Sequence, residues 1–107
     1  MKKINNKAEL EAALKENDVT VVKIGAPWCG PCKTLERTIA EIEESNADTA
    51  EFLEVDVDEA DEEFVDELKV RNIPVMFYYK GEELVDRSVG IVAKDVLLNN
   101  IEHIKEN

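Results

Sequence analysis

Several residue types are scarce in this chain of 107 residues, which contains three prolines, four glycines and a single histidine. No stretch is rich in proline, glycine or serine and no segment repeats, so no part of the sequence marks a linker between domains. We therefore predict one domain over residues 1–107. Its length and its hydrophobic content of 44% suffice for a packed core without metals or structural disulfides.

Positive charge is also scarce, with 13 basic residues against 25 acidic ones and a formal net charge of -12. This balance argues against partners that are polyanions, namely nucleic acids and anionic membrane surfaces. No apolar run approaches the roughly 20 residues of a membrane-spanning helix, and no apolar core of a signal peptide follows the first lysines. We therefore expect a cytoplasmic monomer.

The order of the hydrophobic residues predicts helices that alternate with strands. Strands are expected where β-branched residues cluster, and helices where apolar residues recur at steps of three and four. The expected strands cover residues 19–26, 52–57, 74–79 and 83–89, with a short first strand at 2–5 as an option. The expected helices cover residues 8–15, 31–45 and the acid-rich segment 58–70, followed by a last helix that buries Leu97, Ile101 and Ile104.

These elements define the fold class. A strand, a helix and a second strand in succession require parallel pairing, whereas the hairpin around Lys80-Gly81-Glu82 adds antiparallel strands. We therefore predict an α/β fold with a mixed central β-sheet flanked by helices on both faces.

The two cysteines occur in Trp28-Cys29-Gly30-Pro31-Cys32, where a predicted strand ends and a predicted helix begins. A helix N-terminus stabilises a thiolate and lowers the pKa of a cysteine there. We expect Cys29 to be the exposed nucleophile and Cys32, one turn into the helix on its apolar side, to be shielded. Cys29 would attack a substrate disulfide, and Cys32 would then displace the reduced product.

The residues around the cysteines suit this redox chemistry better than the alternatives. Pro31 begins the helix without losing a hydrogen-bond donor, and Gly30 leaves the approach to Cys29 open. A metal site needs about four ligands, so two cysteines and His103 leave only a metal shared between subunits as an alternative. A structural disulfide would close a loop too short to constrain much of the unfolded chain.

At this point the chain resembles the thioredoxin family over nearly its whole length. The residues that carry the resemblance are the WCGPCK signature at 28–33, Ala26-Pro27, Ile73-Pro74, Gly81 in the turn and Gly90 after the last strand. The resemblance implies a thioredoxin-like fold and a reductant of disulfides in client proteins. It further implies regeneration by an NADPH-dependent thioredoxin reductase, so the chain itself would hold no cofactor beyond its redox-active cysteine pair.

The resemblance also implies roles for single residues. Cys29 would be the nucleophile, Cys32 the resolving thiol and Pro74 a cis-proline opposite them. The substrate-binding surface would consist of Trp28, Gly30, Pro31, Ile73, Gly90 and Ile91. On this surface the backbone of Ile73 would pair with an extended substrate, while ordinary core packing is the alternative role for Ile73 and Ile91.

Three positions depart from the family pattern. Gly25 stands where relatives commonly have an aromatic residue, and Arg37 stands where they have a proline that kinks the helix. The helix through Arg37 should therefore be straighter. Lys23 stands where thioredoxins usually bury an aspartate, and the usual lysine partner of that aspartate aligns with Glu54.

Lys23 is unusual on physical grounds as well, because a lysine in a strand covered on both faces is costly to bury without a partner. Glu54 interrupts the apolar strand FLEVDV in the same way. We predict a charge-exchanged pair of Lys23 and Glu54 behind Cys32, where Glu54 or a neutral Lys23 would accept the proton of Cys32. A cationic Lys23 would instead favour the thiolates. In the alternative arrangement, Lys23 extends to the edge of the sheet and Glu54 is solvated.

Two other functions stay open at the level of sequence. The same fold could act as an oxidant or isomerase, although Gly30-Pro31 between the cysteines favours a reductant. The chain could also be an adaptor in which the fold matters and the thiols do not, but the presence of both cysteines weakens this option.

Overall fold

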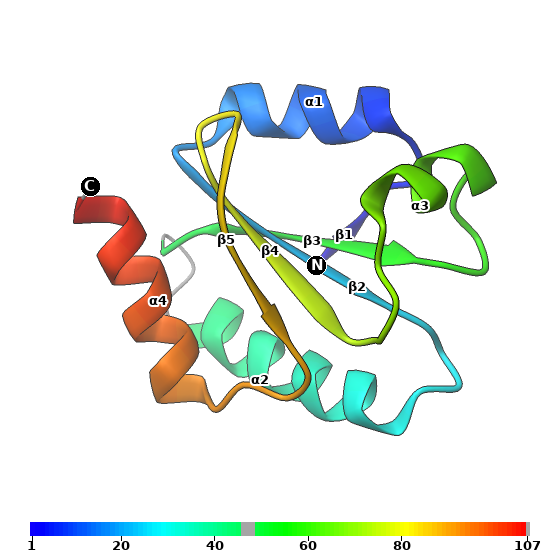
Figure 1. The fold of residues 1–107 in the computed structure, drawn as a ribbon. Coiled ribbons are helices and arrows are strands. Elements are labelled where there is room, and N and C mark those ends of the chain that lie inside the picture. Colours follow the sequence, from blue (N-terminus) through cyan, green and yellow to red (C-terminus); the bar gives the residue numbers. More distant parts are fainter. Residues whose placement is uncertain (46–48, 107) are drawn as a thin grey trace.

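A mixed β-sheet forms the centre of the computed structural model, which describes residues 1–45 and 49–106 (Figure 1). Its strands are β1 (Lys2–Lys3), β2 (Val19–Gly25), β3 (Glu51–Asp56), β4 (Val75–Lys80) and β5 (Glu83–Val89). They lie in the order β1-β3-β2-β4-β5. The strand β3 is parallel to both β1 and β2, whereas β4 is antiparallel to β2 and β5.

Helices cover both faces of this sheet, as Figure 1 shows. They are α1 (Lys7–Glu16), α2 (Gly30–Ser45), α3 (Glu62–Leu68) and α4 (Lys94–Glu106). Apolar residues of α1 and α3 pack in one cluster with Val22 and Ile24 of β2, and those of α2 and α4 pack in another with Val19 and Val21. The predicted α/β class and its flanked mixed sheet are confirmed.

The central strand β2 determines where the unusual lysine points. All of its residues are buried, and successive side chains in a strand face opposite sides of the sheet. Because Val19 and Val21 face α2, Lys23 faces α2 as well, whereas Val22 and Ile24 face α1 and α3.

Every predicted element is present, and the largest difference concerns α3. The acid-rich segment 58–70 forms a helix only over Glu62–Leu68. The preceding residues form a turn in which Asp56 accepts hydrogen bonds from the backbone N–H groups of Asp58, Glu59 and Ala60. The helix α2 begins one residue before Pro31 and runs through Arg37 without interruption.

The predicted domain also includes residues 46–48 and 107, which lie outside the described residues. Over the ranges that are described, no helix combines the length and the apolar character needed to cross a membrane.

Candidate active site

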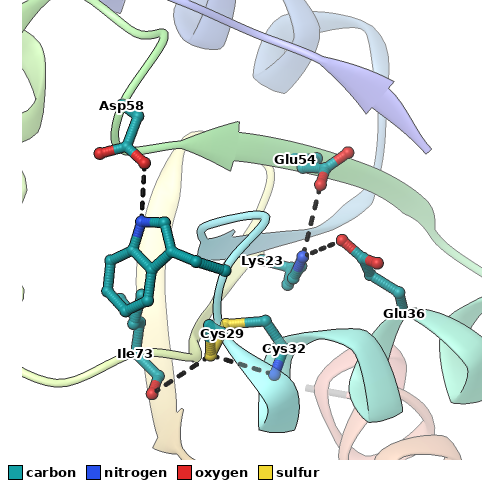
Figure 2. The surroundings of a disulfide bond; sticks show 8 residues. Lys23, Cys29, Cys32, Glu36, Glu54, Asp58 and Ile73 are labelled. Atoms are coloured by element: carbon teal, nitrogen blue, oxygen red, sulfur yellow. Dashed lines mark hydrogen bonds and ion pairs between the residues drawn. A yellow bond between two sulfur atoms is a disulfide. The ribbon is translucent and has the colours of Figure 1, made fainter.

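The two cysteines lie where β2 leads into α2, and a disulfide joins them (Figure 2). The backbone N–H of Cys32, in the first turn of α2, donates a hydrogen bond of 3.2 Å to the Cys29 sulfur. The carbonyl oxygen of Ile73 lies 4.0 Å from the same sulfur. A thiolate formed at Cys29 on reduction would therefore gain a backbone donor and the positive end of the helix dipole.

The exposure of the two cysteines matches the prediction only in part. Cys32 is fully buried, as predicted, but the expectation that Cys29 is exposed is wrong for the disulfide-bonded form, since only 6% of its surface is accessible. Both cysteines form a small apolar cluster with Ala26, against which Val57 and Ile73 pack. Residues that are distant in the sequence thus cover Cys29. Because both cysteines are buried, Cys29 differs from Cys32 mainly in its position just before the first residue of α2.

The predicted proline lies beside the cysteines with the predicted backbone conformation. The Ile73-Pro74 peptide bond is cis, and the carbonyl of Ile73 faces Cys29 (Figure 2). The backbone N–H of Gly90 donates a 2.8 Å hydrogen bond to the Pro74 carbonyl, which brings the segment after β5 to the site. Gly90 has a φ of 87°, a left-handed conformation that glycine adopts without steric cost.

Apolar side chains are exposed around this point. Trp28 and Ile91 are 71% and 55% exposed, so core packing is excluded as the role of Ile91. Ile73 is half-buried and packs against the cysteine cluster. Gly30 and Pro31 are exposed at the start of α2. The predicted substrate-binding residues are therefore accessible, and their role in binding stays a prediction.

The sequence did not reveal the partner of the exposed tryptophan. The indole Nε1 of Trp28 donates a 2.8 Å hydrogen bond to Oδ2 of Asp58 (Figure 2). Asp58 belongs to the turn after β3, where a run of acidic residues gives no sign of a specific contact. This bond fixes the orientation of the ring beside Cys29.

The buried lysine has the predicted partner. Lys23 is 1% exposed, and its Nζ lies 3.3 Å from Oε1 of Glu54, which is 19% exposed. The two residues are in register across β2 and β3. The predicted contact is thus present, and the alternative of a lysine that reaches the edge of the sheet is excluded.

Glu36 of α2 is a closer partner that sequence reasoning missed. Its Oε1 accepts a 2.7 Å hydrogen bond from Lys23 Nζ, and its side chain is 37% exposed. The hydrogen bond from Lys23 holds the pKa of the Glu36 carboxyl below its ordinary value, although partial burial opposes this shift. Its place four residues after Cys32, at the border of the buried stripe of α2, was the available signal.

Gly25 lies close to both the Lys23 side chain and the Cys32 sulfur. A Cβ added at Gly25 would lie 2.8 Å from the Cys32 sulfur and 3.2 Å from Cε of Lys23. The sulfur and the lysine side chain therefore both lie against Gly25, and the missing Cβ is what allows the sulfur to come so close. An aromatic residue at position 25 is incompatible with the present position of the Cys32 sulfur.

A metal centre is not formed by the described part of the chain. In residues 1–45 and 49–106, no three residues of the types His, Cys, Asp and Glu are grouped so that they could hold an ion. His103, the third potential ligand considered from the sequence, lies on α4 and is exposed.

Comparison with known sequences identifies relatives. A family model described as Thioredoxin matches residues 1–103. The chain is 38% identical over 97 residues to a thioredoxin of Mycoplasmoides gallisepticum, a match that covers 91% of this chain and 95% of the relative. It is 34% identical over 79 residues to a thioredoxin of Bacillus subtilis, with 74% and 75% covered.

Solved structures show the same fold. A mutant thioredoxin from Halobacterium salinarum superimposes with a TM-score of 0.88 at 29% identity, covering 99% of this chain and 91% of the other. A second structure comes from a study of the thiol resolving mechanism in yeast mitochondrial 1-Cys peroxiredoxin via glutathione and thioredoxin systems. It superimposes with a TM-score of 0.83 at 26% identity, covering 96% of this chain and 94% of the other.

Proposed function

This chain belongs to the thioredoxin family, and on that premise we propose that it reduces disulfides of cytoplasmic client proteins and is regenerated by thioredoxin reductase. Its activity is that of a thiol–disulfide oxidoreductase of the protein-disulfide reductase type. The observation that carries this conclusion is the Cys29–Cys32 disulfide at the N-terminus of α2. The client class, the reductase and the location are the proposed parts.

The reaction proceeds in two exchanges. The Cys29 thiolate attacks one sulfur of a client disulfide, so that the client S–S bond breaks, a mixed disulfide forms and the other client sulfur leaves as a thiolate that takes up a proton. Cys32 then attacks the Cys29 sulfur, which releases the second client thiol and restores the Cys29–Cys32 disulfide. Two electrons pass from the cysteine pair to the client. The N–H of Cys32, 3.2 Å from the Cys29 sulfur, supports the first step.

The apolar surface around Cys29 is the proposed docking site for the client. Trp28 and Ile91 are exposed apolar side chains of this surface, and the Ile73 carbonyl faces the reacting sulfur. An extended client segment would lie along Ile73 so that its backbone groups pair there. A surface of this kind accepts many sequences, because backbone pairing does not depend on the client's side chains.

Regeneration requires an external source of two electrons, which we assign to an NADPH-dependent thioredoxin reductase. The chain itself is proposed to act as a monomer without bound cofactor or metal. Membership of the thioredoxin family supports disulfide-containing clients. The related chain from the peroxiredoxin work is consistent with peroxiredoxin-type clients. The formal net charge of -12 supports the absence of nucleic acid and membrane partners.

The test is reduction of insulin disulfides with NADPH and a bacterial thioredoxin reductase, followed through NADPH consumption. Cys29→Ser is expected to abolish turnover because it removes the nucleophile. Cys32→Ser is expected to stop after the first exchange and to leave a covalent complex between Cys29 and the client. Full activity of the double Cys29→Ser, Cys32→Ser variant in cells would instead indicate an adaptor, which does not need thiols.

A further inference from the structure

The cluster around Lys23 contains more negative than positive charge. One ammonium contacts two carboxylates, those of Glu36 at 2.7 Å and Glu54 at 3.3 Å, so the three groups carry a net charge of -1. A pair of Lys23 and Glu54 alone would be neutral, and a proton added to it would leave an uncompensated positive charge in a buried place. With Glu36 present, the cluster becomes neutral when it takes up one proton.

The members of this cluster differ in their access to water. Lys23 is 1% exposed and lies on the central strand, whereas the Glu36 side chain is 37% exposed on the flank of α2. Glu54 is 19% exposed. Glu36 is therefore the member best placed to exchange a proton with solvent, and Lys23 is the member on the side of the cysteines.

The cluster adjoins the sulfur that has to lose a proton. Cys32 is fully buried, so water does not reach its thiol directly. Its sulfur and Cε of Lys23 both lie against Gly25, and Glu36 follows Cys32 by one helical turn on α2. A chain of polar groups thus leads from the region of the Cys32 sulfur through Lys23 to the surface.

Other charged groups lie near the route from Cys32 through Lys23 to Glu36, but they do not take the place of these residues. On α2, Lys33 adds a positive charge that acts on Glu36. On β1, Lys3 is in register with Glu54, but its ammonium contacts Glu59 at 2.9 Å. At the end of β3, Asp56 is buried, and its Oδ1 accepts the backbone N–H of Asp58.

We infer that Glu36 is a positioning residue for the second exchange, in which it accepts a proton from Lys23 as Lys23 takes the proton of Cys32. The Cys32 S–H bond breaks, its sulfur bonds to the Cys29 sulfur, and the bond between Cys29 and the client sulfur breaks. The client sulfur leaves with the electron pair of that bond. Glu36 afterwards gives its proton to solvent, which returns the cluster to its charge of -1. The inference rests on the proposed function.

A stopped-flow reaction of the reduced protein with excess dithiobis-nitrobenzoate (DTNB) separates the two exchanges. Attack by Cys29 releases a first thionitrobenzoate at a rate proportional to DTNB. Attack by the buried Cys32 on the mixed disulfide releases a second one at a rate independent of DTNB. A wild-type protein that releases only one equivalent would contradict the proposed function itself, whatever the role of Glu36.

Glu36→Gln is expected to slow the second release at about pH 6 by roughly tenfold or more. This factor lies at or below the lower end of the range by which general bases accelerate reactions. The difference should shrink as the pH rises, because a higher pH favours the Cys32 thiolate without help from a carboxylate. The first release should keep its rate. Glu36→Asp, which retains the carboxylate, should recover part of the lost rate.

Glu41→Gln is the matched control, because it removes the same charge from an exposed position of α2. Its second release should equal that of the wild type at every pH. A purely electrostatic effect of Glu36 has the opposite sign, since loss of a negative charge favours the Cys32 thiolate. An unchanged or faster second release in Glu36→Gln at about pH 6 would therefore overturn the inference.

Discussion

Two lysines lie on either side of Glu54 in the sheet, Lys3 on the edge strand β1 and Lys23 on the central strand β2, and both are in register with it. Each has a carboxylate at a similar distance, 2.9 Å for Lys3 to Glu59 and 2.7 Å for Lys23 to Glu36. Their surroundings differ, because the Lys3 side chain is 47% exposed and that of Lys23 is 1% exposed.

The difference shows that the place in the sheet, more than the length of an ion pair, decides what the pair does. An exposed ammonium exchanges water for a carboxylate at almost equal free energy. A buried ammonium has no water to return to, so the loss of its carboxylates leaves an uncompensated charge. The edge pair is therefore an ordinary surface contact, whereas the central cluster affects both the stability of the fold and the chemistry beside it.

The largest expected effect comes from removing both carboxylates of the central cluster. Glu36→Gln with Glu54→Gln leaves Lys23 buried without an anionic partner, which should lower the free energy of unfolding by about 3 kcal/mol. Urea denaturation at neutral pH measures this change. Adding Lys23→Met to the double variant should restore part of the loss. A double variant as stable as the wild type would mean that the Lys23 ammonium reaches water.

A smaller effect is expected from pH. The hydrogen bond from Lys23 holds the pKa of Glu36 in the folded protein below the ordinary value of 4.5. The folded state therefore binds this proton less readily than the unfolded state, and the Glu36 carboxylate stabilises the fold above pH 4.5. This contribution is lost as the pH falls through the lower pKa of the folded state.

The corresponding measurement is the Tm of the wild type and of Glu36→Gln from about pH 7 to about pH 3. The wild type should have the higher Tm at neutral pH, and the gap should close at the acidic end. Glu41→Gln, which removes an exposed carboxylate without this contact, should show a gap that varies little. A gap for Glu36→Gln that is independent of pH would contradict the assigned cause.

The smallest effect is expected at the edge. The hydrogen bond with Glu59 raises the pKa of Lys3, but the pair is solvated and screened by salt. Lys3→Gln should leave the Tm within the scatter of repeated scans at moderate ionic strength. A clear decrease in Tm would show that the exposed pair of Lys3 and Glu59 contributes to stability as the buried cluster around Lys23 does.

The sequence predicted the order of the elements because apolar periodicity depends only on the local repeat of helix and strand. Lys23 was predicted to need a partner for a similar reason, since a charge inside a β-branched run is anomalous in any α/β sheet. Glu54 was found because it breaks the neighbouring strand in the same manner. The start of α3 was misplaced because Asp56 forms a turn that uses residues 58–60.

The remaining features depend on packing between distant segments, which composition and spacing do not encode. The place of Glu36 one turn after Cys32 is a weak signal, because only the packing of α2 against the sheet brings its carboxylate to Lys23. Cys29 is buried in a cluster against which Ile73 packs, 44 residues further along the chain. The bond between Trp28 and Asp58 likewise joins two loops that the sequence separates.

The central claim, that this chain is a reductant of protein disulfides, is tested most directly by the equilibrium potential of the Cys29–Cys32 couple in a glutathione redox series at neutral pH. We expect a potential more negative than that of the cytosolic glutathione pool, which lies at about -220 to -260 mV. A potential of about -180 mV or higher would contradict it, because a couple so poised would oxidise or isomerise client disulfides instead of reducing them.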